Sequence, residues 1–404
     1  MKFNWDKIRG LIKGDKTIWF IIVALSLFSL VIVYSATGKL AFKEADGNTF
    51  AYAFKHLGKM GLGFIFIILM VNFCPVKYYS KFANILLVIT IGLLYFATAQ
   101  HFLFHTATNR SVNLGFMTFQ TAEIAKICLL IFVSKILATH RKGEFVSRLG
   151  FWKVLIASGI VLLPIALGDS SSALILAGSV FAVMIISRVE FKVLFSTAVV
   201  VIGLLILGIA FSSILPERFG RIHTVRARIM DFWSGDAEEI QGTTQAQYSQ
   251  LAIYEGGKTP VGKGVGNNDV SNFIEAAYSD FIFAIIVEET GIVGAILILF
   301  AYLIILFRGG SIAIRSERSF SAFLVTGIVL MYTIQAFMNM MVATGLFPVT
   351  GQPLPFLSYG GTSMVFTLLA FGIVLSISDQ TKIKPKSELA AGENELQLEE
   401  EEED

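Results

Sequence analysis

The amino-acid sequence predicts an all-α polytopic membrane protein with about ten transmembrane helices and one long extracytoplasmic loop. Three observations lead to this fold class: 55% of the 404 residues are hydrophobic, only 15% are charged, and span-length apolar stretches recur along the chain. Soluble domains carry about 25% charged residues, so a soluble core could not bury this much apolar surface. The net charge of +2, spread over many loops, gives no basis for nucleic-acid binding.

Each predicted span is a stretch of roughly 17 to 25 mainly apolar residues, the length that crosses a bilayer as a helix. The spans are residues 18–35, 60–73, 82–99, 119–137, 152–167, 173–187, 193–215, 281–307, 320–344 and 361–378. Residues 1–17 then form the N-terminal segment, residues 18–378 one transmembrane domain, and residues 379–404 an acidic tail. We expect the first span to be retained as an uncleaved signal anchor and the tail to be disordered.

The distribution of lysine and arginine predicts the orientation. The alternate segments that include the N-terminus hold 19 of these residues, and the short loops on the other side hold five. Cytoplasmic loops carry the excess of positive charge, so both termini are expected in the cytoplasm. Residues 216–280 form the single long external loop, where function should concentrate. The only cysteines, Cys74 and Cys128, lie in or beside apolar stretches, so neither a disulfide nor a metal cluster is expected.

The segment 345–363, here named the signature loop, interrupts the apolar pattern near the C-terminus. Its sequence, GLFPVTGQPLPFLSYGGTS, contains three prolines, four glycines and no charge. Such a segment cannot continue a helix, and non-helical backbone at membrane depth must be buried in protein or line a wet cavity. The sequence therefore predicts a re-entrant or cavity-lining loop.

Asp280 stands where the long external loop enters the eighth span. Ionisable groups at membrane depth are costly and by default indicate function. From its position alone, however, the favoured interpretation is a helix cap, in which Ser279 or Asp280 satisfies free backbone N–H groups.

The signature loop closely resembles that of the SEDS family (shape, elongation, division and sporulation), the FtsW and RodA type of bacterial peptidoglycan glycosyltransferase. A second match is DFIFA at residues 280–284 followed by EETG at residues 288–291. The resemblance runs from the third span to the tenth, and it implies that Asp280 is the catalytic residue. Tyr278 and Ser279 replace the family's more common His-Thr, which changes the flank of the site and leaves the carboxylate in place.

Three further ionisable residues match family positions in the third external connection and the fourth span. Arg110 is a lone basic residue that could simply anchor to lipid headgroups, but the resemblance favours a role on pyrophosphate, which suits a guanidinium fork. Glu123 and Lys126 are spaced i,i+3 and would face one another on a helix. They are equally well interpreted as a buried structural pair or as a substrate site in which Lys126 helps to hold a lipid pyrophosphate.

Four polar residues complete the candidate substrate-binding set. Asp169 matches a family aspartate but could equally cap the sixth span. Gln335 and Asn339, four residues apart in the ninth span, match polar family positions and could equally join helices. Ser358 lies within the signature loop.

Two patterns stand out in the long external loop. Basic and apolar residues alternate from 216 to 233, as in an amphipathic segment lying on a membrane surface, for which simple anchoring is the favoured role. Residues 256–266 are glycine-rich but lack the ending of a phosphate loop, so no nucleotide is expected. We interpret them as flexible backbone beside a bulky glycan, with a plain surface turn as the alternative.

The resemblance implies polymerisation of lipid II at the outer face of the bacterial cytoplasmic (inner) membrane. Asp280 would act as general base on the acceptor hydroxyl, while Arg110, Lys126 or a divalent cation, Mg²⁺ or Mn²⁺, would stabilise the departing pyrophosphate. The family also implies a class B penicillin-binding protein as transpeptidase partner, together with other division or elongation membrane proteins. Residues 14–17 and 33–37 look slightly more like FtsW than RodA, which favours a septal role in division over elongation.

Two other functions stay open at this point. A flippase or transporter for the same lipid would need no base at the outer face and would place its key polar residues near mid-membrane. A membrane scaffold for division proteins would leave every charged residue named above replaceable.

Overall fold

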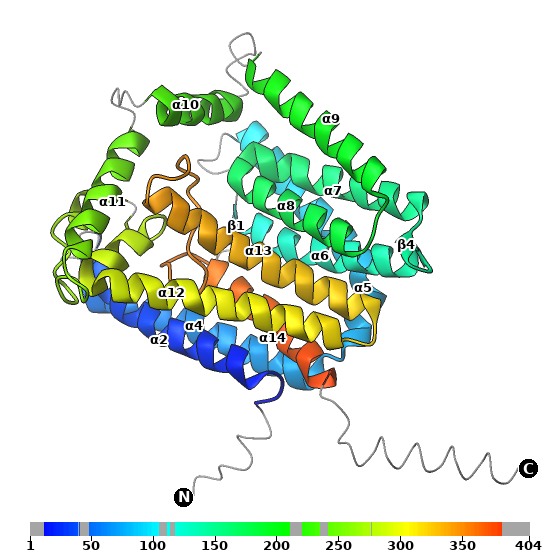
Figure 1. Cartoon of the computed structure of the whole chain (residues 1–404), viewed down its shortest axis with the longest axis horizontal. Coiled ribbons are helices and arrows are strands. Elements are labelled where there is room, and N and C mark those ends of the chain that lie inside the picture. The colour runs from blue at the N-terminus through cyan, green and yellow to red at the C-terminus, as the bar shows by residue number, and fades with distance from the viewer. Residues whose placement is uncertain are drawn as a thin grey trace, which may run out of the picture.

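The structure is a computed structural model that describes residues 12–38, 40, 48–104, 111–113, 118–210, 220–234, 241–275 and 277–381. Within these ranges, ten helices correspond one by one to the ten predicted spans (Figure 1). They are α2 (Lys16–Ala36), α4 (Thr49–Phe73), α5 (Val76–Phe104), α6 (Thr121–Thr139), α7 (Arg148–Gly168), α8 (Ser170–Ile186), α9 (Phe191–Ala210), α12 (Ile282–Arg315), α13 (Ser319–Ala343) and α14 (Ser363–Gln380). The predicted class, an all-α multi-pass membrane protein, is confirmed.

Eight of these ten helices are long and apolar enough to cross a bilayer, among the residues that the structure describes. Of the other two, α8 is apolar but only 17 residues long, and α6 carries three ionisable residues, Glu123, Lys126 and Lys135. Two short antiparallel hairpins flank α6: β1 (Ser111–Asn113) pairs with β2 (Thr118–Gln120), and β3 (Arg141–Lys142) pairs with β4 (Phe145–Val146).

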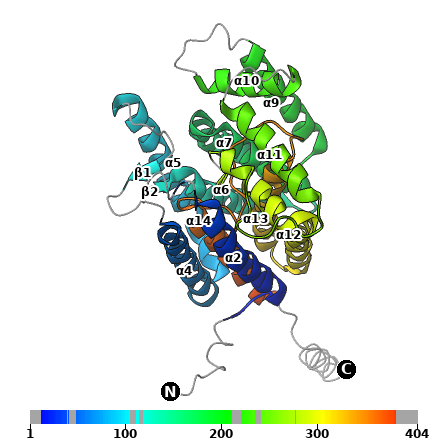
Figure 2. The same ribbon diagram turned by 90° about the vertical axis from the view of Figure 1, so that its left-hand side faces the viewer.

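Helices α13 and α14 form the centre of the bundle. In the most apolar stretch of each, 72% of the residues are buried, against 6% for α9, which lies at the edge. Helix α14 packs most extensively against α4, and α13 packs against α12, α8 and α6 (Figures 1 and 2). The signature loop connects α13 to α14, so it starts and ends in the most buried part of the fold.

The second span differs from the prediction. It was expected to begin at residue 60, but α4 begins at Thr49, where Asn48 caps the helix by accepting a hydrogen bond from the amide of Ala51 at 3.1 Å. The first three turns of α4 are too polar to be recognised as part of a span from hydropathy, yet they bury Tyr52 and His56 on one side. Lys55 and Lys59, predicted in a loop, therefore lie on this helix.

The long loop predicted to be external, residues 216–280, contains helices of its own. Helix α10 (Gly220–Ser234) covers the described part of the predicted amphipathic segment, and α11 (Gln241–Gly257) packs along α12. A 3-10 turn, η3 (Ser271–Phe273), follows. Figure 1 shows α10 and α11 at the end of the bundle where α12 begins.

The glycine-rich segment 256–266 is packed against a break in α12. Gly291 interrupts that helix with φ 68° and ψ −163°, and the amide of Gly264 donates to the carbonyl of Glu289 at 2.9 Å. A Cβ atom on Gly291 would lie 2.4 Å from the backbone nitrogen of Gly262, so only glycine allows the two backbones to cross. The Nζ of Lys263 donates to Glu288 at 3.0 Å, and this hydrogen bond is the main cause that raises the pKa of Lys263. The segment is thus a fixed clamp on α12.

At the opposite end of α12 the two terminal regions meet. Asp15 caps α2 by accepting from the amides of Thr17 at 2.9 Å and Ile18 at 3.0 Å, and it forms an ion pair with Arg308 of α12. The amide of Gly14 donates to Asp379 at 3.3 Å, just beyond the buried part of α14. These contacts place both ends of the transmembrane domain on one side of the bundle.

Candidate active site at the signature loop

Asp280 lies two residues before Ile282, the first residue of α12, and it is partly exposed. Phe281 occupies the N-cap position of α12. Asp280 is therefore not the cap residue that its position alone predicted. The hydroxyl of Ser279 donates to Oδ1 of Asp280 at 2.7 Å. Gly351 of the signature loop lies beside the other carboxylate oxygen, because a Cβ at Gly351 would be 3.4 Å from Oδ2 of Asp280. The carboxylate therefore stands against the signature loop.

Asn339 of α13 ties Asp280 to this loop. Its Nδ2 donates to the backbone carbonyl of Asp280 at 2.7 Å and to that of Gln352 at 2.8 Å, and the residue is only 1% exposed. An amide with two donors satisfies two carbonyls that no helix or strand would pair. One turn earlier, Nε2 of Gln335 donates to the carbonyl of Pro353 at 2.8 Å. The predicted pair on α13 thus holds the backbone of the signature loop.

Asp169 reaches the same loop from the other side of the site. It occupies the N-cap position of α8, as the cap interpretation predicted, and accepts from the amide of Ser172 at 3.2 Å. Nε2 of Gln352 donates to both carboxylate oxygens of Asp169 at 3.1 Å, and the hydroxyl of Ser172 lies 3.1 Å from Oε1 of Gln352. Gln352 therefore links Asp169 to Asn339 and, through it, to Asp280.

Ser358 closes the loop against the segment before α12. Its hydroxyl donates to the carbonyl of Ser279 at 2.6 Å and accepts from the amide of Leu354 at 2.7 Å. The amide of Tyr359 donates to the carbonyl of Tyr278 at 2.9 Å. The two motifs recognised in the sequence, around residues 280 and 358, are thus directly hydrogen-bonded.

Glu123 and Lys126 lie deeper in the bundle. They pair at 2.7 Å as the i,i+3 spacing predicts, and they are 4% and 1% exposed. The Nζ of Lys126 is 6.0 Å from the ring centre of Tyr332, and the rings of Tyr332 and Phe371 are 5.7 Å apart. Phe371 in turn packs against Phe356 of the signature loop, with ring centres 4.9 Å apart. The pair supports the core beneath the loop.

Two cations at the signature loop were missed by the sequence analysis as site residues. Lys59 of α4 donates to the carbonyl of Gly360 at 3.4 Å and lies 5.0 Å from the ring centre of Tyr359. Nη1 of Arg228 on α10 donates to the carbonyl of Val349 at 3.0 Å. The missed signal for Lys59 is the spacing of Tyr52, His56 and Lys59, which places all three on one helical face.

Two predictions, the pyrophosphate role of Arg110 and a divalent cation, have no counterpart among the residues that the structure describes. Arg110 lies outside the residues that the structure describes. Within the described ranges, no group of three or more histidine, cysteine, aspartate or glutamate side chains is arranged to hold a metal ion.

The arrangement fits proton transfer from a substrate hydroxyl to the Asp280 carboxylate. One carboxylate is presented on an anchored backbone, a hydroxyl donates to it, and two cations donate to carbonyls near the ends of an uncharged loop. A general base needs this kind of fixed position within hydrogen-bond reach of the proton that it takes.

Comparison with known proteins identifies the family. The model of the FtsW/RodA/SpoVE family, described as cell cycle protein, matches residues 15–383. The chain belongs to this family. The membership predicted from the motifs at residues 280–291 and 345–363 is therefore confirmed.

Relatives in this family match over almost their whole length. The chain is 29% identical over 388 residues to the peptidoglycan glycosyltransferase MrdB of Escherichia coli K12, covering 96% of this chain and 98% of that one. It is 30% identical over 393 residues to the probable peptidoglycan glycosyltransferase FtsW of Geobacter metallireducens, covering 95% and 99%.

Solved structures of similar proteins share the FtsW/RodA fold. One comes from a study of how a peptidoglycan synthase complex coordinates polymerisation and crosslinking; it matches with a TM-score of 0.71 at 22% identity, covering 92% of this chain and 99% of that one. The rod shape determining protein RodA of Thermus thermophilus matches with a TM-score of 0.64 at 21% identity, covering 92% and 98%.

Proposed function

We propose that this protein is a peptidoglycan glycosyltransferase that polymerises lipid II into glycan strands, with Asp280 as general base. The names of the relatives support the activity, and one structural observation supports the assignment of the base. Asp280 is the carboxylate that the signature loop, α13 and Ser279 together fix in place. The resemblance of the motifs at residues 280–291 and 345–363 to those of the family supports the same assignment.

In the proposed step, the Asp280 carboxylate takes the proton from the acceptor sugar hydroxyl. The acceptor oxygen forms a bond to the anomeric carbon of the donor, and the bond from that carbon to the pyrophosphate breaks, so undecaprenyl pyrophosphate leaves with the electron pair. A single displacement of this kind inverts the anomeric configuration. A positioned general base contributes about 10²- to 10⁴-fold to such a rate.

Charge on the departing pyrophosphate needs cations. In the described part of the chain, Lys59 and Arg228 donate to carbonyls near the two ends of the signature loop, and Arg110 stays in the proposal on the strength of its family match. Lys126 is held by Glu123 in the core, so its proposed role is indirect.

A divalent cation, Mg²⁺ or Mn²⁺, remains part of the proposal as a companion of the substrate. The described residues offer no built metal site, and Mg²⁺ is commonly held by one or two carboxylates plus substrate phosphates. The pyrophosphate would then supply most of its ligands, and none of the steps above depends on it.

We further propose a setting for the reaction in the bacterial cytoplasmic membrane, with both termini cytoplasmic and the site at the outer face. The excess of lysine and arginine on the side of the termini supports this orientation. A class B penicillin-binding protein is the proposed transpeptidase partner. A structural neighbour from a synthase complex supports that pairing, and division is our preferred role over elongation.

The test is a polymerisation assay on the full-length protein purified with its transpeptidase partner, with fluorescent lipid II and Mg²⁺ or Mn²⁺. We expect a glycan ladder from the wild type and from Asp269→Asn, and none from Asp280→Asn. Asp269 is the matched control, because it is an exposed carboxylate in the same external loop, with 84% of its side chain accessible. A full ladder from a folded Asp280→Asn protein would refute the assignment. Absence of any ladder, with lipid II crossing liposome bilayers, would favour the flippase.

A further inference from the structure

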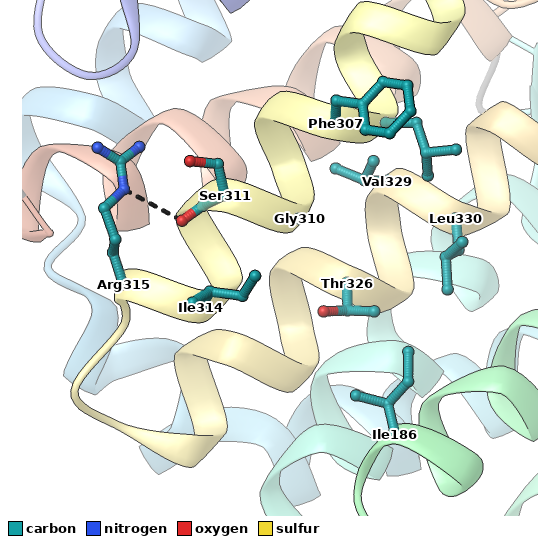
Figure 3. A pocket seen from close by; sticks show the side chains of 10 residues that line it. Ile186, Phe307, Gly310, Ser311, Ile314, Arg315, Thr326, Val329 and Leu330 are labelled. Atoms are coloured by element: carbon teal, nitrogen blue, oxygen red, sulfur yellow. Dashed lines mark hydrogen bonds between the residues drawn. The ribbon is translucent and has the colours of Figure 1, made fainter.

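A groove lies between the last part of α12 and the neighbouring helices α13 and α8 (Figure 3). Its volume is about 490 Å³. Phe307, Gly310 and Ile314 of α12 face Thr326 and Leu330 of α13 across it, with Ile186 of α8 at its lower edge in this view. It lies at the end of α12 that bears Arg308 and Arg315, the end predicted to face the cytoplasm. It is thus at the opposite end of α12 from Asp280.

The floor of this groove is apolar. The one hydroxyl from α13, that of Thr326, donates to the carbonyl of Ala322 in its own helix at 2.8 Å and so leaves its methyl group to the groove. Ile314 and Phe307 are 88% and 72% exposed. Exposed apolar side chains on a spanning helix face hydrocarbon, so the groove opens toward lipid.

Gly310 borders the groove. A Cβ atom at Gly309 would lie 2.6 Å from the side chain of Val329, where the two helices touch. A Cβ atom at Gly310 would meet nothing within 4 Å. The backbone at residue 310 therefore borders open space, which a larger side chain at this position would enter.

The groove ends at a cation. Arg315 lines it, and its Nε donates to the carbonyl of Ser311 at 3.1 Å within the same helix (Figure 3). In the described part of the chain, no carboxylate lies within 4.0 Å of Arg315, whereas Arg148, Arg188 and Arg308 each pair with one. An unpaired guanidinium at the polar end of an apolar groove complements an anionic group on an apolar chain.

The cation at the end of the groove favours a lipid as its occupant, because a phospholipid carries a phosphate group next to its acyl chains. We propose that the groove binds one acyl chain of a phospholipid with a negatively charged headgroup, whose phosphate contacts Arg315. The lipid belongs to the leaflet at that end of the bundle, and the site is independent of the proposed catalytic site.

The test compares lipid retention by native mass spectrometry of the full-length protein in detergent. The probes are phosphatidylglycerol and phosphatidylethanolamine with the same acyl chains. We expect the wild type to retain the anionic lipid about fivefold better, the preference that one basic residue near a membrane surface gives. Arg315→Gln should remove this preference, and Arg318→Gln should keep it, because Arg318 is exposed near the same end without lining the groove.

A second variant tests the acyl chain separately from the charge. Gly310→Leu places a side chain in the open space and favours the helix, so the protein should fold with an unchanged melting temperature and retain less of both lipids. Equal retention of the two lipids by the wild type would overturn the proposal. So would an equal effect of Arg318→Gln, or unchanged retention by a folded Gly310→Leu protein. Displacement of the lipid only by a bound partner helix would assign the groove to that partner instead.

Discussion

Asn339 and Asp280 are joined by a hydrogen bond of 2.7 Å, in which the side-chain amide of Asn339 donates to the backbone carbonyl of Asp280. The same amide nitrogen donates to the carbonyl of Gln352. A helix in the centre of the bundle thereby sets the distance between the proposed base and the signature loop.

Asn339→Leu should lower the rate of polymerisation about 10- to 100-fold, because misplacement of a catalytic group by about 1 Å can cost 10²-fold. The effect should fall on kcat in the fluorescent lipid II assay. Gln335→Leu is the matched control, since Gln335 holds the same loop at Pro353 without touching Asp280, and it should cost less. Equal losses in both variants would mean that loop anchoring matters in general and Asp280 is not specifically placed by Asn339.

Gln352→Glu should impair activity, because it brings a second carboxylate to the position where the amide of Gln352 now meets Asp169 at 3.1 Å. Asp169→Asn in the same protein should restore much of the loss, since the new amide can donate to the new carboxylate. A double-mutant cycle on polymerisation rate measures this coupling, for which contacting residues give about 0.5–3 kcal/mol. Strict additivity of the two losses would argue against a direct link between Gln352 and Asp169.

Gly291→Ala should destabilise the protein by at least about 2 kcal/mol, because alanine at φ 68° and ψ −163° is strained and its Cβ would meet the backbone of Gly262. The measurement is thermal unfolding in detergent. Gly92→Ala is the control, as a Cβ there meets nothing within 4 Å, and it should be neutral or slightly stabilising. A melting temperature for Gly291→Ala equal to that of Gly92→Ala would show that the backbone contact between segment 256–266 and α12 accommodates the extra Cβ without loss of stability.

The Asp15–Arg308 pair should make stability depend on pH in the acid range. Burial raises the pKa of Asp15, but the hydrogen bond and charge of Arg308 and the amides of α2 outweigh it, so the pKa lies below its usual 3.8. A lowered pKa means that the stabilisation is present above pH 3.8 and is lost as the pH falls through the lower folded value. The melting temperature of the wild type should therefore drop as the pH falls below 3.8.

Substitutions at Asp15 separate its two roles. Asp15→Asn keeps a cap for α2 and loses the charge, so its stability should lack this pH dependence. Asp15→Ala should lose about 1 kcal/mol more, the usual cost of removing a helix cap. Identical melting curves for Asp15→Asn and the wild type down to pH 3 would contradict the role of the ion pair.

The sequence predicted the spans and the importance of the signature loop because both follow from local composition. The lengths of the apolar stretches predicted ten helices, and three prolines and four glycines showed that the signature loop between the last two could not be helical. The site residues came mainly from family resemblance. Local composition did not reveal that Asp169, Asn339 and Ser358 meet at one loop, since their partners are fixed by the tertiary fold.

The sequence did not reveal Gln352 or Lys59 as site residues, for two different reasons. Gln352 is one neutral residue in a loop, and its partner Asp169 is 183 positions away. Lys59 was lost because a search for apolar stretches starts the second span at residue 60, which removes the polar first turns of α4. A helical face shared by Tyr52, His56 and Lys59 was the available signal, and only the periodicity carries it.

The signature loop owes much of its shape to side chains outside itself. Its carbonyls at Gln352, Pro353 and Pro355 accept from Asn339, Gln335 and Tyr302, which lie on α13 and α12. Genetic suppressors of defects in the loop should therefore arise on these two helices, many residues away in sequence. Conversely, grafting the loop alone onto another membrane scaffold would not transfer its conformation, since the side chains of α12 and α13 that hold its carbonyls would be missing.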